Sequence, residues 1–103
     1  MLLVNIDSIS NKEVEELGIV KGSVVRTKHI GKDVMAGFKT LVGGEIASYT
    51  EMMGEARSIA TSRMIKEAQS LNADAIVGVR YTSAAVMGGA AEIMAYGTAV
   101  KYK

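Results

Sequence analysis

The sequence predicts an α+β fold in which one long helix packs on a small, mainly antiparallel sheet of about four strands. The stretch from Gly43 to about Asn72 has apolar residues at helical spacing and is the longest regular segment. Four other segments are rich in residues that favour extended structure. Between the last two of these, the MGGA stretch at 87–90 predicts a tight hairpin, which makes those two strands antiparallel.

The 103 residues are predicted to form one domain, 1–103, with no room for a second core. Apolar residues make up 49% of the chain, and its mean hydropathy is positive. A chain this short buries only about two thirds of the surface that it exposes when unfolded. The remaining apolar surface needs cover, so we expect a homo-oligomer.

Several classes of protein are excluded by composition. No apolar run approaches the roughly 18 residues of a membrane span, and the first ten residues lack the basic start of a signal peptide and contain Asp7. We therefore expect a cytoplasmic protein without a membrane partner. Cysteine is absent, which removes disulfides and thiolate metal sites. A net charge of +1 with interspersed signs predicts no nucleic-acid partner.

The first half of the chain predicts two strands and two short helical segments. Met1 to Ile6 is a short apolar run that ends in polar residues, which is typical of a strand. Ser10 or Asn11 is placed to cap a single helical turn that Gly18 would close.

A second strand is predicted from Ile19 through Ile30, where β-branched residues are frequent, with Gly22 marking a turn or bulge near its entrance. Gly31 to Val42 has apolar residues at helical spacing and predicts a short helix that Gly43 ends.

The long helix, Glu45 to Leu71, would extend roughly 40 Å at 1.5 Å per residue, whereas a compact chain of this size is roughly 33 Å across. Either the helix bends or a neighbour covers its overhang. The predicted core stripe contains Ile46, Tyr49, Met53, Ala56, Ala60, Met64 and Leu71, flanked by Met52 and Ile59.

A second strip of the helix carries mostly small side chains: Gly54, Thr61, Ile65 and Ala68. Gly54 costs about 1 kcal/mol relative to alanine in a helix interior. Its presence favours either close packing against another backbone or a bend. A tolerated surface glycine is the equal alternative.

After the helix, Asp74 to Val86 is apolar on both of its alternating sets, which predicts a strand buried on both faces. The last strand, Ala91 to Lys103, divides into large and small residues. The large set is Met94, Tyr96, Thr98, Val100 and Tyr102, and the small set is Ile93, Ala95, Gly97 and Ala99. Such a division suits a strand that packs one face on a helix and the other face on a neighbouring sheet or subunit.

Three stretches in order carry a family resemblance: GGEIASYTEMMGEAR, SRMIKEAQSLNADAIVGVR and AEIMAYGTAVKY. They resemble the YbjQ-like family of small proteins, labelled heavy-metal-binding, over essentially the whole chain. The resemblance implies a ββαβ-type subunit that assembles into a ring-shaped homo-oligomer, a pentamer in known members. It implies no particular reaction. Asn72 stands where the family usually has glycine, and asparagine tolerates the left-handed conformation that follows a helix.

The family label makes a metal ion the only suggested cofactor, so the ligands were counted. His29 is the only imidazole, which excludes the usual structural zinc sets within one subunit but leaves open a site on a symmetry axis. Thioethers of the seven methionines could bind Cu(I). Met52, Met53 and Met64 lie on the apolar stripe or its edge, where methionine is ordinary core packing.

Candidate ligand-binding residues are Gly43, Gly44, Glu45, Arg57 and Arg80. The glycine pair at a helix start could present free N–H groups to an anion. The Glu45 carboxylate argues against an anion there, because it already suits the positive helix end. No nucleotide-binding motif is present.

Candidate interface residues are Gly54, Arg63 and Glu67. Arg63 and Glu67 lie four residues apart on the apolar side of the helix, and a pair there would set register at an interface. The other cations in apolar or strand-forming surroundings would need acidic partners such as Glu45, Glu51, Glu55 or Glu92; these cations are Arg26, Arg57 and Arg80. Ion-pair scaffolding is favoured over acid–base catalysis, because no nucleophile with an adjacent base can be named.

The favoured function is therefore a homo-oligomeric binding or scaffold protein that holds a small ligand or ion at subunit boundaries or in a central pore. The alternatives are a heavy-metal-binding or sequestering protein and an enzyme with a Glu/Arg site shared between subunits.

Overall fold

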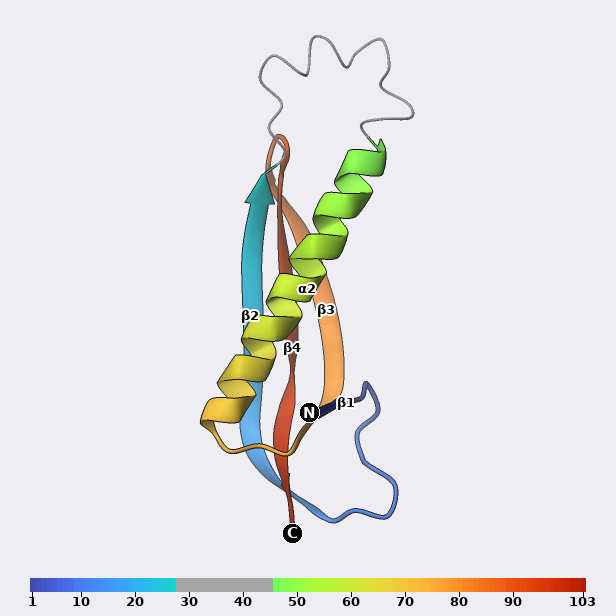
Figure 1. Ribbon diagram of the computed structural model, residues 1–103, viewed down its shortest axis with the longest axis vertical. Coiled ribbons are helices and arrows are strands. Elements are labelled where there is room, and N and C mark those ends of the chain that lie inside the picture. Colours follow the sequence, from blue (N-terminus) through green and yellow to red (C-terminus); the bar gives the residue numbers. More distant parts are fainter. Residues whose placement is uncertain (28–45) are drawn as a thin grey trace.

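The computed structural model describes residues 1–27 and 46–103, which form one helix on one four-stranded sheet (Figure 1). The strands are β1 (Leu2–Leu3), β2 (Val14–Thr27), β3 (Ala75–Met87) and β4 (Ala90–Tyr102), and the helix is α2 (Ile46–Ser70). The sheet order is β1-β3-β4-β2. The β1–β3 pair is parallel and the other two pairs are antiparallel, so the sheet is mixed. This confirms the α+β fold and the two strands predicted after the helix, whereas the ββαβ pattern implied by the resemblance has only one strand there.

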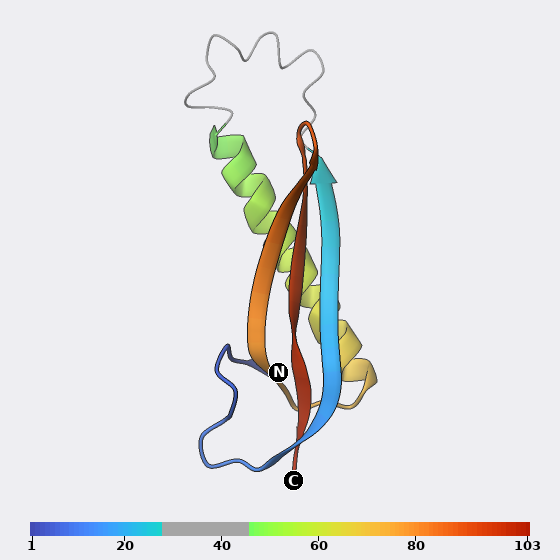
Figure 2. The ribbon, with the colours of Figure 1, turned by 180° about the vertical axis from the view of Figure 1, so that it is seen from behind.

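The helix lies diagonally across one face of the sheet, and the N-terminal segment lies at the β3 side (Figures 1 and 2). Contacts of α2 are mainly with β2 and β4 rather than with β3. No helix in the described part of the chain is long and apolar enough to cross a membrane.

Strand β2 begins earlier than the sequence predicted. The segment 14–17 is extended and pairs with the end of β4, so the predicted helical turn closed by Gly18 is wrong. A single helical turn is unfavourable, because several backbone dihedrals are fixed for one hydrogen bond. Pairing of this segment with β4 is therefore preferred. The bulge is at Gly18 (φ 124°), whereas Gly22 pairs regularly with Ala95. Residues 28–30 and the predicted helix Gly31 to Val42 lie outside the described residues.

The helix approaches β2 most closely at Gly22. A Cβ on this residue would overlap the Ala60 carbonyl oxygen and the Met64 amide nitrogen, and would lie 2.7 Å from the Arg63 Cβ. Only glycine fits there. The close approach expected at Gly54 is absent from the described structure, where the nearest atom to such a Cβ is Arg57 Nη2 at 3.9 Å.

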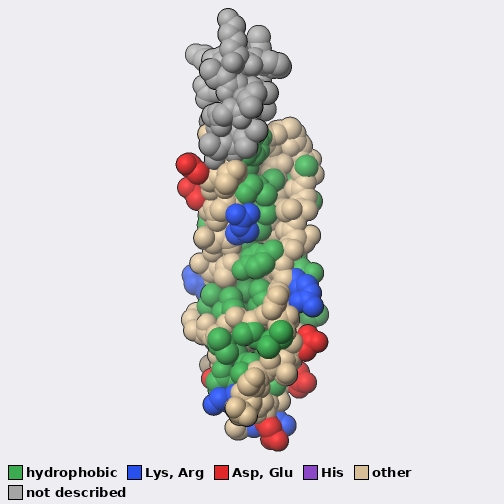
Figure 3. Space-filling model, turned by 90° about the vertical axis from the view of Figure 1, so that its right-hand side faces the viewer, with side chains coloured by type: hydrophobic (Ala, Val, Ile, Leu, Met, Phe, Trp, Pro, Cys, Tyr) green, Lys and Arg blue, Asp and Glu red, His purple; other side chains and the backbone are tan. Residues whose placement is uncertain are grey.

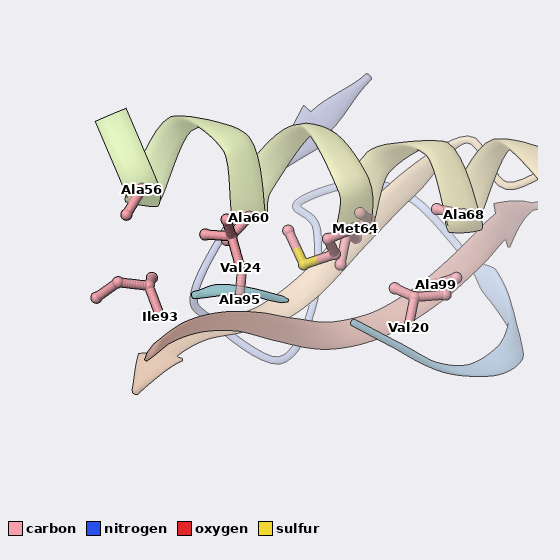
Figure 4. Packing of buried hydrophobic residues seen from close by; sticks show 10 residues of the cluster. Val20, Val24, Ala56, Ala60, Met64, Ala68, Ile93, Ala95 and Ala99 are labelled. Atoms are coloured by element: carbon pink, nitrogen blue, oxygen red, sulfur yellow. The ribbon is translucent and has the colours of Figure 1, made fainter. Parts of the chain in front are cut away.

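The core lies between α2 and the β2–β4 pair (Figure 4). Five helix residues spaced four apart are buried: Met52, Ala56, Ala60, Met64 and Ala68. Rows with this spacing incline by about 26° to a helix axis, which agrees with the diagonal course of α2. The strand side chains that meet them are Val20, Val24, Ile93, Ala95 and Ala99.

This buried row partly corrects the predicted stripe. Ala68, which the sequence placed on the small-residue strip, is fully buried, while Leu71 is 42% exposed. The core position of Met52 and Met64 is confirmed, and Met53 packs against the core half-buried.

One face of β4 packs on the helix, as predicted, and the structure shows that it is the small side, whereas the large side faces away. Close packing explains Gly97, because a Cβ there would lie 2.8 Å from Ile76 Cγ2. The predicted hairpin is confirmed, since Met87 pairs with Ala90 and Gly89 has a φ of 76°. Asn72 follows the helix with a φ of 61°, the conformation expected of it.

Strand β3 divides into two unlike halves. Ala75, Ile76 and Val77 are buried, but the strand is exposed from Arg80 to its end. The prediction of a strand buried on both faces is therefore wrong for the outer half. The reason is that, among the described residues, the N-terminal segment covers only the inner half and α2 packs mainly on β2 and β4.

The N-terminal segment covers the inner half of β3 on the face opposite the helix. Only Leu2–Leu3 of the predicted strand Met1 to Ile6 is regular β structure, but backbone bonds continue along β3, from Val79 N–H to Val4 and from Gly78 N–H to Ile6. A small second cluster forms under this segment: Ala75, Val77 and Val100, with Val4, Ile9, Val14 and Tyr102 against them.

Candidate functional site

The outer half of β3 is an open, uncharged strand edge. Tyr81 is 47% exposed, Val86 51% and Met87 69%, and no charged residue occurs from Tyr81 through Gly89. Among the described residues this half pairs with β4 alone. Figure 3 looks at the side of the molecule on which β3 lies in Figure 1, and hydrophobic side chains run along most of its length. We call residues 81–87 the β3 edge.

The opposite edge of the sheet, strand β2, is partly covered by the helix. Arg63 Nη1 donates to the Ser23 carbonyl at 2.6 Å, and Arg26 Nη2 forms an ion pair with Glu55 Oε2 at 2.8 Å. The predicted need of Arg26 for an acidic partner is thus met by Glu55. These contacts fix the side of α2 that lies beside β2.

A shallow groove runs along this side of α2. Two adjoining depressions share Ser58 and Ile59 and together form what we call the α2 groove. Its lining residues are Glu51, Gly54, Glu55, Ser58, Ile59, Ser62, Arg63, Lys66 and Gln69. The carboxylates lie toward the start of the helix and the cations toward its end, so the groove is polar along its rim with half-buried Ile59 within it.

Two of the three interface candidates, Gly54 and Arg63, line this groove. Glu67 is exposed, and no ion pair joins it to Arg63 among the described residues. Arg63 turns instead to the β2 backbone, where the Ser23 carbonyl is within reach. The single chain therefore shows no Arg63–Glu67 pair, and the predicted role of these two residues at an interface stays a prediction.

The two ligand-binding candidates that the structure describes, Arg57 and Arg80, do not come together in one chain. Arg57 is exposed on α2, whereas Arg80 lies on the sheet face that α2 does not cover and donates from Nη1 to the Asn5 carbonyl at 3.2 Å. The other three, Gly43, Gly44 and Glu45, lie outside the described residues, as does His29.

Within the described ranges 1–27 and 46–103, no group of three or more His, Asp or Glu side chains is placed to hold a metal ion. The thioether of Met64 is fully buried in the core.

One contact of the candidate surfaces was not foreseen from the sequence. The hydroxyls of Thr61 and Tyr81 lie 2.8 Å apart, and Thr61 also donates to the Arg57 carbonyl at 2.7 Å. Tyr81, the first residue of the β3 edge, is therefore hydrogen-bonded to α2. Because side chains alternate along a strand, the sequence could have placed Tyr81 on the face opposite Arg80. The helix residue that Tyr81 meets could not be predicted, because it depends on how α2 packs on the sheet.

A protein-family model described as “Putative heavy-metal-binding” matches residues 1–103. A “UPF0145 protein” from Alkaliphilus metalliredigens is 66% identical over 102 residues, which cover 99% of each chain. A “UPF0145 protein” from Thermotoga maritima is 56% identical over 98% of this chain and 96% of its own.

A solved structure shares the fold. It is a crystal structure of a protein “with unknown function” of the DUF74 family from Pediococcus pentosaceus, with a TM-score of 0.64 at 16% identity, covering 100% of this chain and 98% of that one. At this identity the likeness concerns the fold alone.

Proposed function

Because the chain belongs to this YbjQ family of UPF0145 proteins, we propose that it is a homo-oligomeric binding or scaffold protein whose copies join through the β3 edge. The observation that carries the proposal is the exposure of this edge, from Tyr81 to Met87, a segment without charge or proline. An open strand of this kind pairs readily with another chain unless it is covered. Natural proteins protect such edges with charges, proline or packed elements, and the β3 edge has none of these in the described structure.

We propose that another copy of the chain covers the β3 edge, because the family resemblance implies a homo-oligomer and exposed apolar surface of this kind is typical of protein contacts. The exposed apolar side chains of the edge would then be buried at the subunit contact.

The second surface of that contact is the α2 groove or the β2 edge beside it. These features lie at the opposite edge of the sheet from β3, as the strand order and the α2–β2 contacts require. A contact between two different surfaces is head-to-tail, and it closes into a ring when the rotation between copies allows. The family resemblance implies five copies, and we propose a pentameric ring.

In such a ring, charged residues that are distant within one chain can meet across a boundary. Arg57 and Arg80 lie on different faces of the subunit, and the α2 groove carries Glu51 and Glu55 at one end. A small ligand or ion held between copies is consistent with this distribution. Heavy-metal binding is the alternative, with ligands from several copies around one axis.

Native mass spectrometry of the purified protein at micromolar concentration tests the assembly. We expect one species of five copies. Val86→Lys places a charge on the β3 edge and should release monomers, because a lysine on a strand edge opposes edge-to-edge pairing. The matched control is Ser10→Lys, which adds the same charge at an exposed position away from both edges. A wild-type protein that is monomeric under these conditions contradicts the proposal.

The same instrument separates the two ligand classes. The assembled protein is exposed to Zn²⁺, Cu²⁺ and Ni²⁺ and desalted before measurement. A retained metal mass in proportion to the number of copies supports the heavy-metal alternative, whereas an unchanged mass excludes it for these ions.

A further inference from the structure

Three hydrogen-bond donors lie side by side on the sheet face that α2 leaves uncovered. In the sheet register, Tyr96 of β4 lies opposite Lys21 of β2 on one side and opposite Arg80 of β3 on the other. Side chains alternate between the faces of a strand, and the next residue row, Gly22 with Ala95, is beneath the helix. Lys21, Tyr96 and Arg80 therefore face away from α2. We call them the donor row.

The spacing of the donor row suits one small ligand. Adjacent strands are about 4.8 Å apart, so the backbones of Lys21 and Arg80 are roughly 10 Å apart with Tyr96 midway. Both cations are exposed at the ends of long side chains, and Tyr96 is half-buried between them. A group resting over Tyr96 is within reach of both charges.

The donors of the row have few partners in the described part of the chain. Its two ion pairs are Arg26–Glu55 and Lys101–Asp74, so neither Lys21 nor Arg80 is paired with a carboxylate there. Arg80 uses one N–H in its bond to the Asn5 carbonyl at 3.2 Å, and a guanidinium has five. The Tyr96 hydroxyl has no protein partner among these residues, although a buried tyrosine hydroxyl usually finds one.

The nearby acids do not neutralise the row. Glu92 is on the same face of β4, but four residues from Tyr96, which is about 13 Å along a strand. The Asp7 Oδ1 lies 3.8 Å from where a Cβ on Gly78 would be, two residues before Arg80. No ion pair joins Asp7 to Arg80 among the described residues.

From this juxtaposition we propose that Lys21, Tyr96 and Arg80 bind a small oxyanion of the phosphate type. The guanidinium can donate two parallel N–H bonds to phosphate oxygens, the lysine supplies a point charge, and the phenol donates an O–H. Two positive charges match a dianion better than a carboxylate with one charge. All three residues belong to one copy, so this site goes beyond the proposed assembly and does not depend on it. It also repels metal cations, which sets it apart from heavy-metal binding.

Line broadening of the ³¹P signal of inorganic phosphate, titrated with the whole protein at fixed ionic strength, tests the site. We expect saturable broadening, weakened about tenfold in Arg80→Gln and in Lys21→Gln, because each loses one charge-assisted contact. Tyr96→Phe should weaken it several-fold. Glycerol phosphate should broaden as inorganic phosphate does if the ligand is a phosphate ester.

The matched controls are Lys12→Gln and Lys103→Gln, which remove exposed cations near the end of β4, away from the donor row. They should leave the titration unchanged. Because all the charged positions are exposed, circular dichroism should show each variant folded. Equal weakening in the controls, or no broadening by the wild-type protein at millimolar phosphate, overturns the site. Competition by acetate as strong as that by sulfate overturns the preference for a doubly charged anion.

Discussion

The two edges of the sheet are strands of similar length with opposite protection. Strand β2 has 14 residues, carries Lys21 and Arg26, and is bound by helix side chains through Arg63 and Glu55. Strand β3 has 13 residues, and its segment from Tyr81 to Met87 carries no charge and is hydrogen-bonded to α2 through Tyr81. The β2 edge is thus protected within the chain, whereas the β3 edge is uncovered among the described residues. Variants on the two edges should therefore behave differently.

The largest difference is expected between two methionines. Met64 is fully buried beneath α2 beside β2, so Met64→Ala should lower the free energy of unfolding by about 3 kcal/mol through lost burial and a residual cavity. Met87, at the end of the β3 edge, is 69% exposed in the single chain, so Met87→Ala should change the stability of a monomer by less than about 0.5 kcal/mol. Urea unfolding of both variants in the Val86→Lys background, which should be monomeric, measures the two losses. Equal losses there would mean that another part of the same chain covers the β3 edge.

A smaller effect is expected from glycines. Gly22→Ala should cost about 2 kcal/mol, because the new Cβ overlaps the helix backbone and forces α2 away from β2. Gly88→Ala is the control, since nothing lies within 4 Å of its Cβ position. Thermal unfolding compares the two variants, and an unchanged midpoint for Gly22→Ala would show that α2 does not pack there.

The contact of the β3 edge with α2 should be worth still less. Tyr81→Phe removes the hydroxyl that meets Thr61 and should cost about 1 kcal/mol. Thr61→Val should cost about the same, and the double variant should cost little more than either alone. Strict additivity in this cycle would show that the two hydroxyls do not interact in solution.

The smallest effect is expected for the ion pair over β2. Arg26 and Glu55 are 40% and 64% exposed, so solvent screens their attraction. Glu55→Gln should cost no more than about 0.5 kcal/mol, and the loss should vanish in 1 M salt. A loss that persists in salt would point to a packing role for the Glu55 side chain.

Two residues of the α2 groove could be predicted from the sequence, but the arrangement of the candidate surfaces could not. Gly54 and Arg63 were singled out by helical spacing, and both line the α2 groove. The donor row was not found, because Lys21, Tyr96 and Arg80 are distant in sequence and meet only through strand register. The open β3 edge was also missed. An apolar strand has the same sequence pattern whether an element of its own chain or another copy covers it.

The sequence by itself determined the elements whose signals are local. The periodicity of α2, the hairpin at Gly88 and Gly89, the left-handed Asn72 and the two faces of β4 follow from side-chain spacing and backbone freedom, which neighbours along the chain set. Only the tertiary structure decided which glycine packs against the helix backbone, where β2 bulges, and which half of β3 stays uncovered. These depend on how the helix lies across the sheet, and that angle is set by packing between residues far apart in the sequence.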